Sequence, residues 1–178
     1  VSVFVIASCA EEGFEPIPSN FSGEMIYKGQ ALALDNAVIM QGPAIDSITF
    51  VSTLAITKNV KYFVDDSTQT VDSISGTGSG IFIDVYHRDT LGIESRVYNQ
   101  NDIQPKKRPG AFDEGVVILN ADLSLEEPDT TDFSFIRNGR LVLNQISPVV
   151  YEYEFTGTDQ QGNKITVTAK GLTEIFKF

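Results

Sequence analysis

The sequence predicts an all-β fold, an antiparallel β-barrel or β-sandwich of about 8–10 strands. Composition is the first reason, because the 12 Phe, the 6 Tyr and the many Val, Ile and Thr residues are types enriched in strands. The chain has no long runs of Ala, Leu, Glu and Lys, which are typical of helices. The second reason is that short β-rich runs recur between turn signals from Gly23 onward, without alternating helical segments.

The candidate strands follow one another along the chain. They cover residues 26–34, 36–41, 47–57, 60–64, 69–75, 80–88, 93–98, 115–122, 132–137, 140–146, 149–157 and 163–170. A short helix at 89–95 or at 172–176 stays open as an alternative, but neither run is long enough to change the fold class.

The last two candidate strands form the clearest pair. Apolar and polar residues alternate through both of them, and the residues between them are typical of a turn. This pattern predicts a hairpin with one buried face. On its second strand, that face comprises Ile165, Val167 and Ala169.

Turn and loop signals separate the other strands. Residues 137–140, Arg-Asn-Gly-Arg, place an Asn-Gly pair between two β-like runs and predict a type I′ hairpin turn. Residues 99–110 lack an apolar period and contain two prolines, which indicates a long loop. The acidic stretch 126–132 is expected to be a second loop, and the glycine-rich residues 76–80 a flexible connection.

Length and charge limit the classes of function. With 178 residues and 42% hydrophobic content, the chain suits one compact domain, which we expect over residues 24–178. The 24 acidic residues exceed the 13 basic ones and give a formal net charge of -11. Because such a surface repels phosphate backbones, a nucleic-acid partner is not expected.

The N-terminal segment carries a possible lipid-attachment signal. Residues 1–8 are an uncharged apolar run that ends at Cys9, the only cysteine of the chain. This run is too short for a membrane span of ~20 residues, and small residues precede Cys9 as they do at the end of a signal peptide. Residues 6–9, Ile-Ala-Ser-Cys, resemble the lipobox of bacterial lipoproteins, which implies that Cys9 is acylated. The alternative is a free thiol buried in a first strand.

The residues around Cys9 extend this interpretation. No Met or basic segment precedes the apolar run, so we expect the chain to start part-way through a precursor and residues 1–8 to be a residual signal peptide. Residues 9–23 contain prolines and acids that do not suit a central strand, and they predict a tether. Acids directly after the cysteine are similar to the export signal of Bacteroidetes lipoproteins, which implies a place on the outer face of the outer membrane.

The domain itself has a resemblance of the same kind. Three segments follow in order, Leu-Asp-Asn-Ala-Val-Ile at 34–39, Gly-Ile-Phe-Ile-Asp-Val at 80–85 and Asn-Gly-Arg-Leu-Val-Leu at 138–143. With the closing segments 151–159 and 162–171, they resemble the small lipocalin-like β-barrel or β-sandwich lipoproteins of Bacteroidetes. Most members of that group have no assigned activity, so the resemblance implies a fold and a location but no site residue.

Catalytic and metal-binding residue sets are scarce. A catalytic triad needs a histidine beside its nucleophile, and the single histidine, His87, is expected to be exposed at a strand end among charges. One histidine and one acylated cysteine cannot form a zinc site. A phosphate-binding loop at 76–80 is excluded, because the glycines run into a strand without the required Lys. We therefore expect no enzyme activity, no cofactor and no catalytic metal.

Calcium is the one metal left open. Acidic side chains gather in the loop 126–132, and Ca²⁺ takes carboxylate and carbonyl oxygens as ligands. Their spacing does not match an EF-hand, and the alternative is a solvated acidic loop. The acids concerned are Glu126, Glu127, Asp129 and Asp132.

Two surfaces are candidates for binding. Tyr62, Tyr86 and Tyr98 lie near predicted strand ends and could form a platform for a glycan, or they could pack in the core. The second candidate is the only dense basic patch, on the long loop between two prolines. Its residues, Lys106, Lys107 and Arg108, are expected either to solubilise the loop or to dock an acidic partner or lipopolysaccharide.

Short Asp-Ser/Thr motifs also occur, and they resemble the O-glycosylation motif of Bacteroidetes. Glycosylation requires an exposed loop, so the expectation is limited to Thr90 and Thr130, which lie in turn-like stretches.

These observations lead to two hypotheses. The first is a non-enzymatic, surface-exposed outer-membrane lipoprotein that acts as an accessory or docking subunit of a transport or secretion complex. The second is a ligand-binding lipoprotein that captures a glycan or a small apolar molecule.

Overall fold

The computed structural model describes residues 20–65, 67–88, 92–100, 107–125, 129 and 132–177. Four residues with predicted roles, Cys9, Thr90, Lys106 and Thr130, lie outside this described part. Within it the chain forms one 13-stranded sheet. Its strands are β1 (Ser22–Tyr27), β2 (Gln30–Leu34), β3 (Asn36–Ala44), β4 (Phe50–Lys58), β5 (Lys61–Asp65), β6 (Thr70–Ser75), β7 (Thr77–His87), β8 (Arg96–Gln100), β9 (Ala111–Asp122), β10 (Phe133–Ser147), β11 (Val150–Asp159), β12 (Lys164–Leu172) and β13 (Glu174–Lys177).

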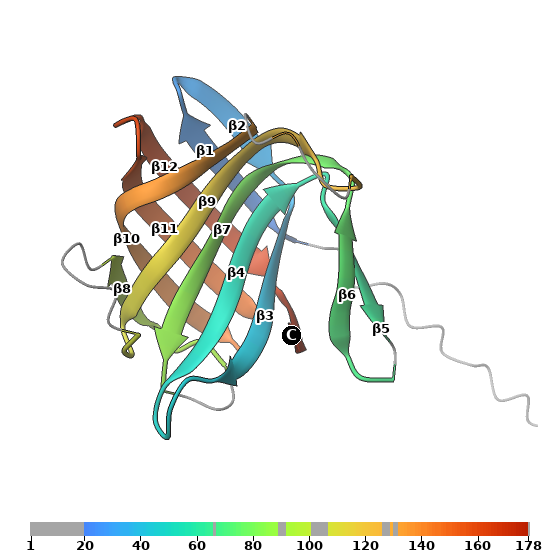
Figure 1. Cartoon of the computed structure of the whole chain (residues 1–178), viewed down its shortest axis with the longest axis vertical. Coiled ribbons are helices and arrows are strands. Elements are labelled where there is room, and N and C mark those ends of the chain that lie inside the picture. The colour runs from blue at the N-terminus through green and yellow to red at the C-terminus, as the bar shows by residue number, and fades with distance from the viewer. Residues whose placement is uncertain are drawn as a thin grey trace, which may run out of the picture.

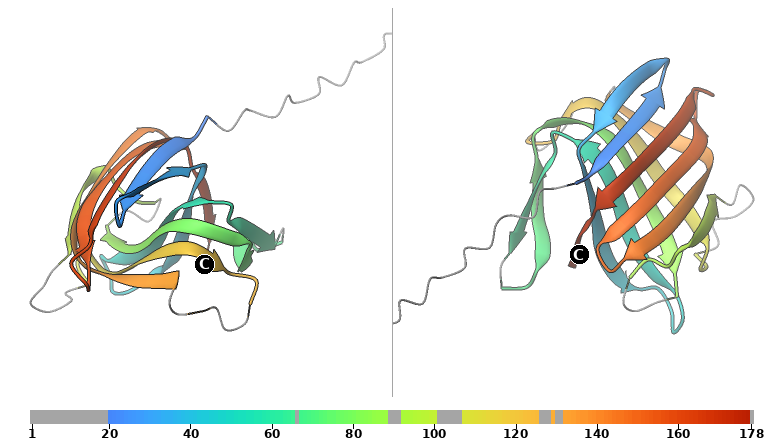
Figure 2. Two further views of the ribbon diagram at one scale, coloured as in Figure 1. Left: turned by 90° about the horizontal axis from the view of Figure 1, so that it is seen from above. Right: turned by 180° about the vertical axis from the view of Figure 1, so that it is seen from behind.

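The predicted all-β fold class is confirmed. Strands make up 74% of the described residues, and the sheet closes into a β-barrel with further strands hydrogen-bonded outside it. The strand order is β2-β1-β12-β11-β10-β8-β9-β7-β4-β3-β13-β6-β5, with an additional β10–β9 pairing. Seen from above, the strands curve around one interior (Figure 2). Among the described residues, no helix has the length and apolar character needed to cross a membrane.

The first predicted strand, 26–34, is a hairpin of two strands. Lys28 and Gly29 interrupt it with φ values of 50° and 75°. Two successive positive φ angles are the geometry of a type I′ turn, which folds β2 back onto β1 in an antiparallel register. This turn is one reason why the described sheet has more strands than the sequence predicted.

The predicted turn at Asn138-Gly139 is wrong, because β10 continues through it, with a register shift between Ile136 and Asn138. Asn138 pairs with Thr158, and Gly139 pairs with Gly157 of β11. A Cβ atom on Gly139 would lie 2.5 Å from Cζ of Phe155. The glycine therefore allows the Phe155 ring to pack closely against β10. An Asn-Gly pair in a sequence does not indicate this role.

The predicted C-terminal hairpin is confirmed. β11 and β12 pair without interruption from Val150↔Leu172 to Thr158↔Lys164. The expected face points inward, since Ile165, Val167 and Ala169 are all buried.

Residues 172–176, left open as a helix, are strand in the structure except for Thr173. β13 pairs in parallel with β3, and only Thr173 separates it from β12. The C-terminal segment therefore pairs first with β1 and β11 and then with β3, so it connects two parts of the sheet that are far apart in strand order. This connection depends on contacts between distant residues, which local patterns do not encode.

The glycine-rich residues 76–80 are also mostly strand, which corrects the prediction of a flexible connection. β7 begins at Thr77, and Gly78 and Gly80 are buried. A Cβ atom on Gly80 would lie 2.4 Å from the Ile56 carbonyl oxygen. The glycines allow β7 to lie close to β4.

Side chains fill the barrel interior. The largest fully buried ones include Tyr27, Tyr98, Phe112, Tyr153 and Phe155. A second apolar layer lies outside, where the β5–β6 hairpin stands beside the barrel wall (Figure 1). There Tyr62, Val71 and Phe176 pack against the buried outward-facing residues Val38, Met40 and Ala55.

Candidate functional site

The barrel wall divides between β9 and β10. The two strands pair only where Phe133–Phe135 meets Val116–Ile118. Beyond that point β8 lies between them, pairing with β10 at Arg140–Leu143 and with β9 at Ala111–Phe112. We call the place where β9 and β10 separate the fork. Divergence of two strands leaves backbone groups that need other partners.

Gln100, the last residue of β8, bridges the fork. Its Nε2 donates to the Asp113 carbonyl oxygen at 3.2 Å and to the Ile136 carbonyl oxygen at 3.3 Å. Its Oε1 is buried and accepts no hydrogen bond from any described residue. Within the described part of the chain, Gln100 Oε1 is thus a buried acceptor without a donor, which is uncommon in folded proteins.

A groove of about 420 Å³ opens at the fork. Because Ile81, Ile83 and Val85 point into the barrel, the alternating residues Phe82 and Asp84 of β7 point outward. Residues from β7, β9, β10 and the turn after β11 line this fork groove. They are Phe82, Asp84, Asp113, Gly115, Val116, Phe135, Ile136 and Gln160.

Phe135 is the most exposed apolar residue of the fork groove. Its side chain is 60% exposed although it lies on a central strand. The Phe135 carbonyl oxygen accepts a hydrogen bond from the Gln160 backbone nitrogen at 3.0 Å, which holds Gln160 at the groove. Phe135 therefore contributes exposed aromatic surface to the fork groove.

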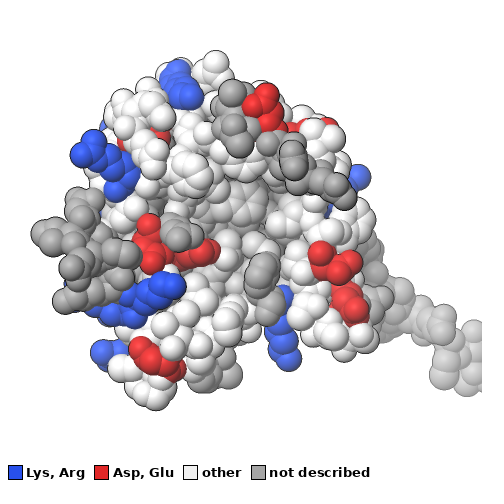
Figure 3. Space-filling view, in the orientation of Figure 1, with Lys and Arg blue, Asp and Glu red and all other residues white. Residues whose placement is uncertain are grey.

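Two carboxylates from adjacent strands lie on the other side of the fork groove. Thr53 Oγ1 donates to Asp84 Oδ1 at 2.6 Å, and the Tyr86 hydroxyl donates to Asp113 Oδ1 at 2.8 Å. A shift in the β7–β9 register next to Asp84 accompanies this arrangement. In Figure 3, acidic side chains gather over β7 and β9, with basic side chains directly below them.

The surroundings of Asp84 disfavour its negative charge. Burial raises the pKa of Asp84 above its ordinary value, and the charge of Asp113 raises it further. The hydrogen bond from Thr53 and the charge of Lys107 act in the opposite direction without restoring the ordinary pKa. The negative charge of Asp84 is thus only partly compensated by the described residues around it.

The structure places part of the predicted basic patch beside these acids. Lys107 and Arg108 are exposed at the start of the segment that leads into β9. The charge of Lys107 acts on Asp84, and the Arg108 carbonyl oxygen accepts from the Ala111 backbone nitrogen at 3.1 Å. No sequence pattern indicates that Lys107 lies near an acidic pair from other strands.

The expectation that His87 is exposed is wrong. His87 is 2% exposed and Ser52 is 1% exposed, with 2.9 Å between His87 Nε2 and Ser52 Oγ. The His87 ring also stacks against Phe50 with 6.1 Å between ring centroids. His87 shares the inward face of β7 with Ile83 and Val85, because alternate residues of a strand point the same way. Burial therefore keeps both side chains away from the solvent.

Of the two interpretations of Tyr62, Tyr86 and Tyr98, the structure contradicts the glycan platform. Tyr86 is 3% exposed and Tyr98 is fully buried, so neither ring presents a face to solvent. Tyr62 is half-buried and packs in the layer between the β5–β6 hairpin and the barrel. The alternative interpretation, that these residues pack in apolar layers, is the correct one.

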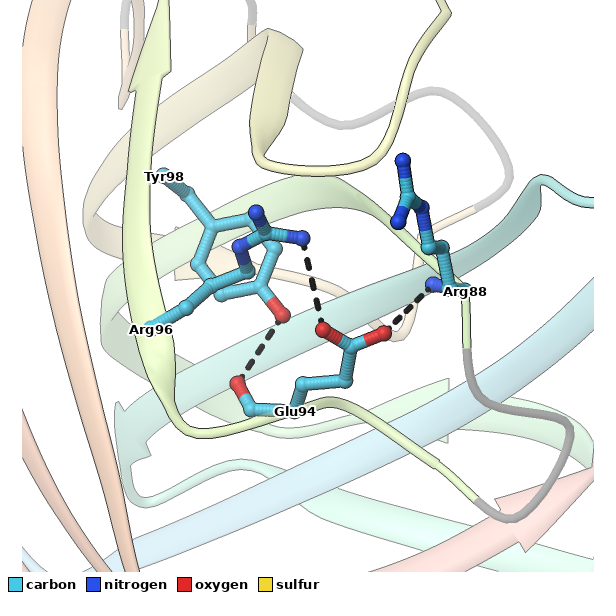
Figure 4. A network of polar contacts seen from close by, with 4 residues as sticks. All are labelled: Arg88, Glu94, Arg96 and Tyr98. Atoms are coloured by element: carbon cyan, nitrogen blue, oxygen red, sulfur yellow. Dashed lines mark hydrogen bonds and ion pairs between the residues drawn. The ribbon is translucent and has the colours of Figure 1, made fainter.

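Tyr98 belongs instead to a polar network at one end of β8 (Figure 4). Its hydroxyl donates to the Glu94 carbonyl oxygen at 3.0 Å, and burial raises its pKa. The Glu94 carboxylate accepts from the Arg88 backbone nitrogen at 3.0 Å and from Arg96 Nη1 at 3.3 Å. These contacts fix residues 92–96 against the end of β7, which is a structural role.

The calcium hypothesis involves residues that are partly outside the described part. Glu126 and Glu127 lie outside it, whereas the Asp132 backbone nitrogen donates to the Asp129 carbonyl oxygen at 3.2 Å. The described residues contain no group of three or more His, Cys, Asp or Glu side chains that could hold a metal ion.

Comparison of the chain with protein-family models, with characterised proteins and with solved structures gives no match.

Proposed function

We propose that this protein is a non-enzymatic docking module of a lipid-anchored outer-membrane lipoprotein, and that a partner protein binds in the fork groove. The observation that carries the proposal is Phe135, which is 60% exposed in a groove that also contains two carboxylates. Aromatic residues in grooves are frequent anchors of protein interfaces, where a few side chains provide most of the binding energy.

The filled interior supports a binding surface on the outside. Lipocalin-like barrels that hold a small ligand keep room for it between their strands. Here Tyr27, Tyr98, Tyr153 and Phe155 occupy the interior as fully buried side chains. An apolar ligand inside the barrel would have to displace this core, so capture of a small apolar molecule is the less favoured hypothesis.

The charges beside the fork groove support selective docking. Asp84 and Asp113 line the groove, and the charge of Lys107 acts on Asp84, so both signs of charge occur at the groove. Such a pattern orients a partner of complementary charge and increases its association rate. Lys106 and Arg108, the other residues of the predicted basic patch, are proposed to contact the partner together with Lys107. Lys106 lies outside the described residues.

The predicted anchor at Cys9 and the outer-membrane location belong to the same proposal. They rest on the resemblance of residues 6–9 to a lipobox. Cys9→Ser should leave the domain folded and release it from membranes, because the acyl chains provide the anchoring free energy. Membrane fractionation and intact mass test this, and a mutant that stays in the outer membrane without an acyl mass would contradict it.

A glycan is the second candidate occupant of the fork groove. The exposed Phe135 ring could stack on a sugar, and the Asp84 and Asp113 carboxylates could accept hydrogen bonds from its hydroxyl groups. This alternative uses the same residues and does not require a partner protein.

The experiment is purification of the lipidated protein from detergent-solubilised membranes of its native host. Phe135→Ala should remove a stoichiometric protein partner that the unchanged protein retains. The control is Phe63→Ala, because Phe63 is 51% exposed on β5 and does not line the fork groove. Equal retention by both variants would overturn the docking role of the groove, and recovery of a monomer with bound saccharide would favour the glycan.

A further inference from the structure

We propose that the fork groove binds the guanidinium group of an arginine side chain, presented by the partner protein. This inference rests on the proposed docking function and adds the chemistry that the partner must bring.

The first argument is the excess of hydrogen-bond acceptors at the fork. Only Oδ1 of Asp84 and Oδ1 of Asp113 accept hydrogen bonds from described side chains, which leaves each Oδ2 for a ligand. Guanidinium carries five N–H donors and no acceptor, so it complements such a site better than a group with mixed polarity.

The second argument is electrostatic. Asp84 is faced by Thr53 from β4, by Asp113 from β9 and by Lys107, so two carboxylates oppose one described cation. Burial weakens the hydration of the Asp84 carboxylate, which makes its negative charge costly. A cation that enters the fork groove relieves this cost, and the net charge of -11 attracts basic groups towards the protein.

The third argument is the shape and polarity of the remaining walls. Phe82 and Phe135 provide aromatic surface, and Val116 and Ile136 provide aliphatic surface. Guanidinium is planar, weakly hydrated and able to stack on an aromatic ring while it donates to a carboxylate. The lysine ammonium is compact and strongly hydrated, so it loses more when it leaves water for such a groove.

The test is an NMR titration of the full chain produced as Cys9→Ser, so that it stays free of lipid. The probe is N-acetyl-arginine amide, and the matched control probe is N-acetyl-citrulline amide, which has a nearly identical shape but no charge. The arginine probe should shift the amide signals of Gly115 and Gln160, and citrulline should bind at least about tenfold more weakly. Added salt should weaken arginine binding, since screening reduces charge attraction.

Two variants complete the test. Asp84→Asn should weaken arginine binding about tenfold, although the Asn side-chain oxygen can still accept from Thr53. Asp72→Asn, an exposed acid on β6 outside the fork groove, should leave it unchanged. Preserved signal dispersion in both variants shows that the fold is intact.

Equal binding of arginine and citrulline, or an Asp84→Asn variant that binds arginine normally, would overturn the arginine proposal. Signals of Gly115 and Gln160 that respond to cellobiose and not to arginine would overturn it in favour of the glycan. Partner capture that needs Phe135 but survives Asp84→Asn would overturn the arginine proposal alone. Partner capture that survives Phe135→Ala overturns the docking proposal instead, so the two failures are distinguishable.

Discussion

The Tyr27 hydroxyl donates a hydrogen bond of 2.5 Å to Asp159 Oδ2, across 132 positions of sequence. Tyr27 ends β1 and Asp159 ends β11, so the bond connects the β1–β2 turn to the β11–β12 turn at one end of the barrel. Asp159 also accepts from the backbone nitrogens of Gln161 and Asn163 at 2.9 and 2.8 Å. Both side chains are buried, which makes the bond stronger than it would be in water.

The Tyr27–Asp159 bond should contribute measurably to the stability of the barrel. Tyr27→Phe removes one donor to a buried carboxylate, and we expect a loss of ~1–3 kcal/mol in the free energy of unfolding by urea. Tyr151→Phe is the control, because the Tyr151 hydroxyl accepts only from the neutral Gln145 amide at 2.9 Å among the described side chains. A Tyr27→Phe loss no greater than that of the control would show that the charge of Asp159 adds nothing.

The same pair should make folding sensitive to acid. Burial alone would raise the pKa of Asp159, but hydrogen bonds from Tyr27, Asn163 and Gln161 hold it below its ordinary value. A carboxylate with a lowered folded pKa stabilises the fold above its unfolded pKa of ~3.9, and this stabilisation is lost as pH falls through the folded value.

Urea unfolding between pH 6 and pH 2 measures this dependence. The unchanged protein should lose more stability than Asp159→Asn over this interval, since the variant has no carboxylate to protonate there. At the other extreme, burial and Asp159 raise the pKa of Tyr27 to about 12, so its contribution should persist through pH 10 and decline as pH rises through about 12. Parallel acid profiles for the two proteins would contradict the assignment to Asp159.

Gly139 should be intolerant of a side chain although it lies in an Asn-Gly pair. A Cβ atom there would meet Cζ of Phe155 at 2.5 Å and Cζ of Phe112 at 3.2 Å. Gly139→Ala should therefore cost ~1–3 kcal/mol through overpacking. Gly29→Ala meets no atom within 4 Å, and its cost should come only from the φ of 75°. Thermal or urea unfolding that ranks Gly29→Ala as the more damaging change would contradict this account.

The sequence predicted those parts of the fold that depend on local alternation. Residues 149–157 and 163–170 gave the correct hairpin and the correct buried face, because a period of two is visible in consecutive residues. The Asn138-Gly139 pair led to the prediction of a turn that is not there, because pairing with β11 overrides its propensity for a turn. A short-range signal decides the structure only where long-range packing does not oppose it.

The fork groove could not be predicted from the sequence for a related reason. Asp84 and Asp113 are far apart in the chain, and they meet because β7 and β9 pair with a shifted register. Phe135 lies beside them because β10 pairs with β9 there, and Gln160 is held by a hydrogen bond to the Phe135 carbonyl oxygen. No local sequence pattern indicates that these residues lie together. The alternation within β7 predicts only that Asp84 lies on the outward face.

Asp84→Asn should stabilise the domain while it weakens binding. The folded pKa of Asp84 is raised by burial and by Asp113, so the charged form is less favourable in the folded than in the unfolded protein. A group with a raised folded pKa stabilises the fold below its unfolded pKa, and this contribution is lost as pH rises through the folded value. At pH 7 the neutral Asn should therefore increase the free energy of unfolding. The increase should be only roughly 0.5 kcal/mol, because part of the side chain still reaches solvent.

Urea unfolding at pH 7 and at pH 3 checks this, with Asp72→Asn as the control. The gain should shrink at pH 3, where Asp84 is protonated in both states, and a variant that is less stable at pH 7 would show that Asp84 serves the fold and not a ligand.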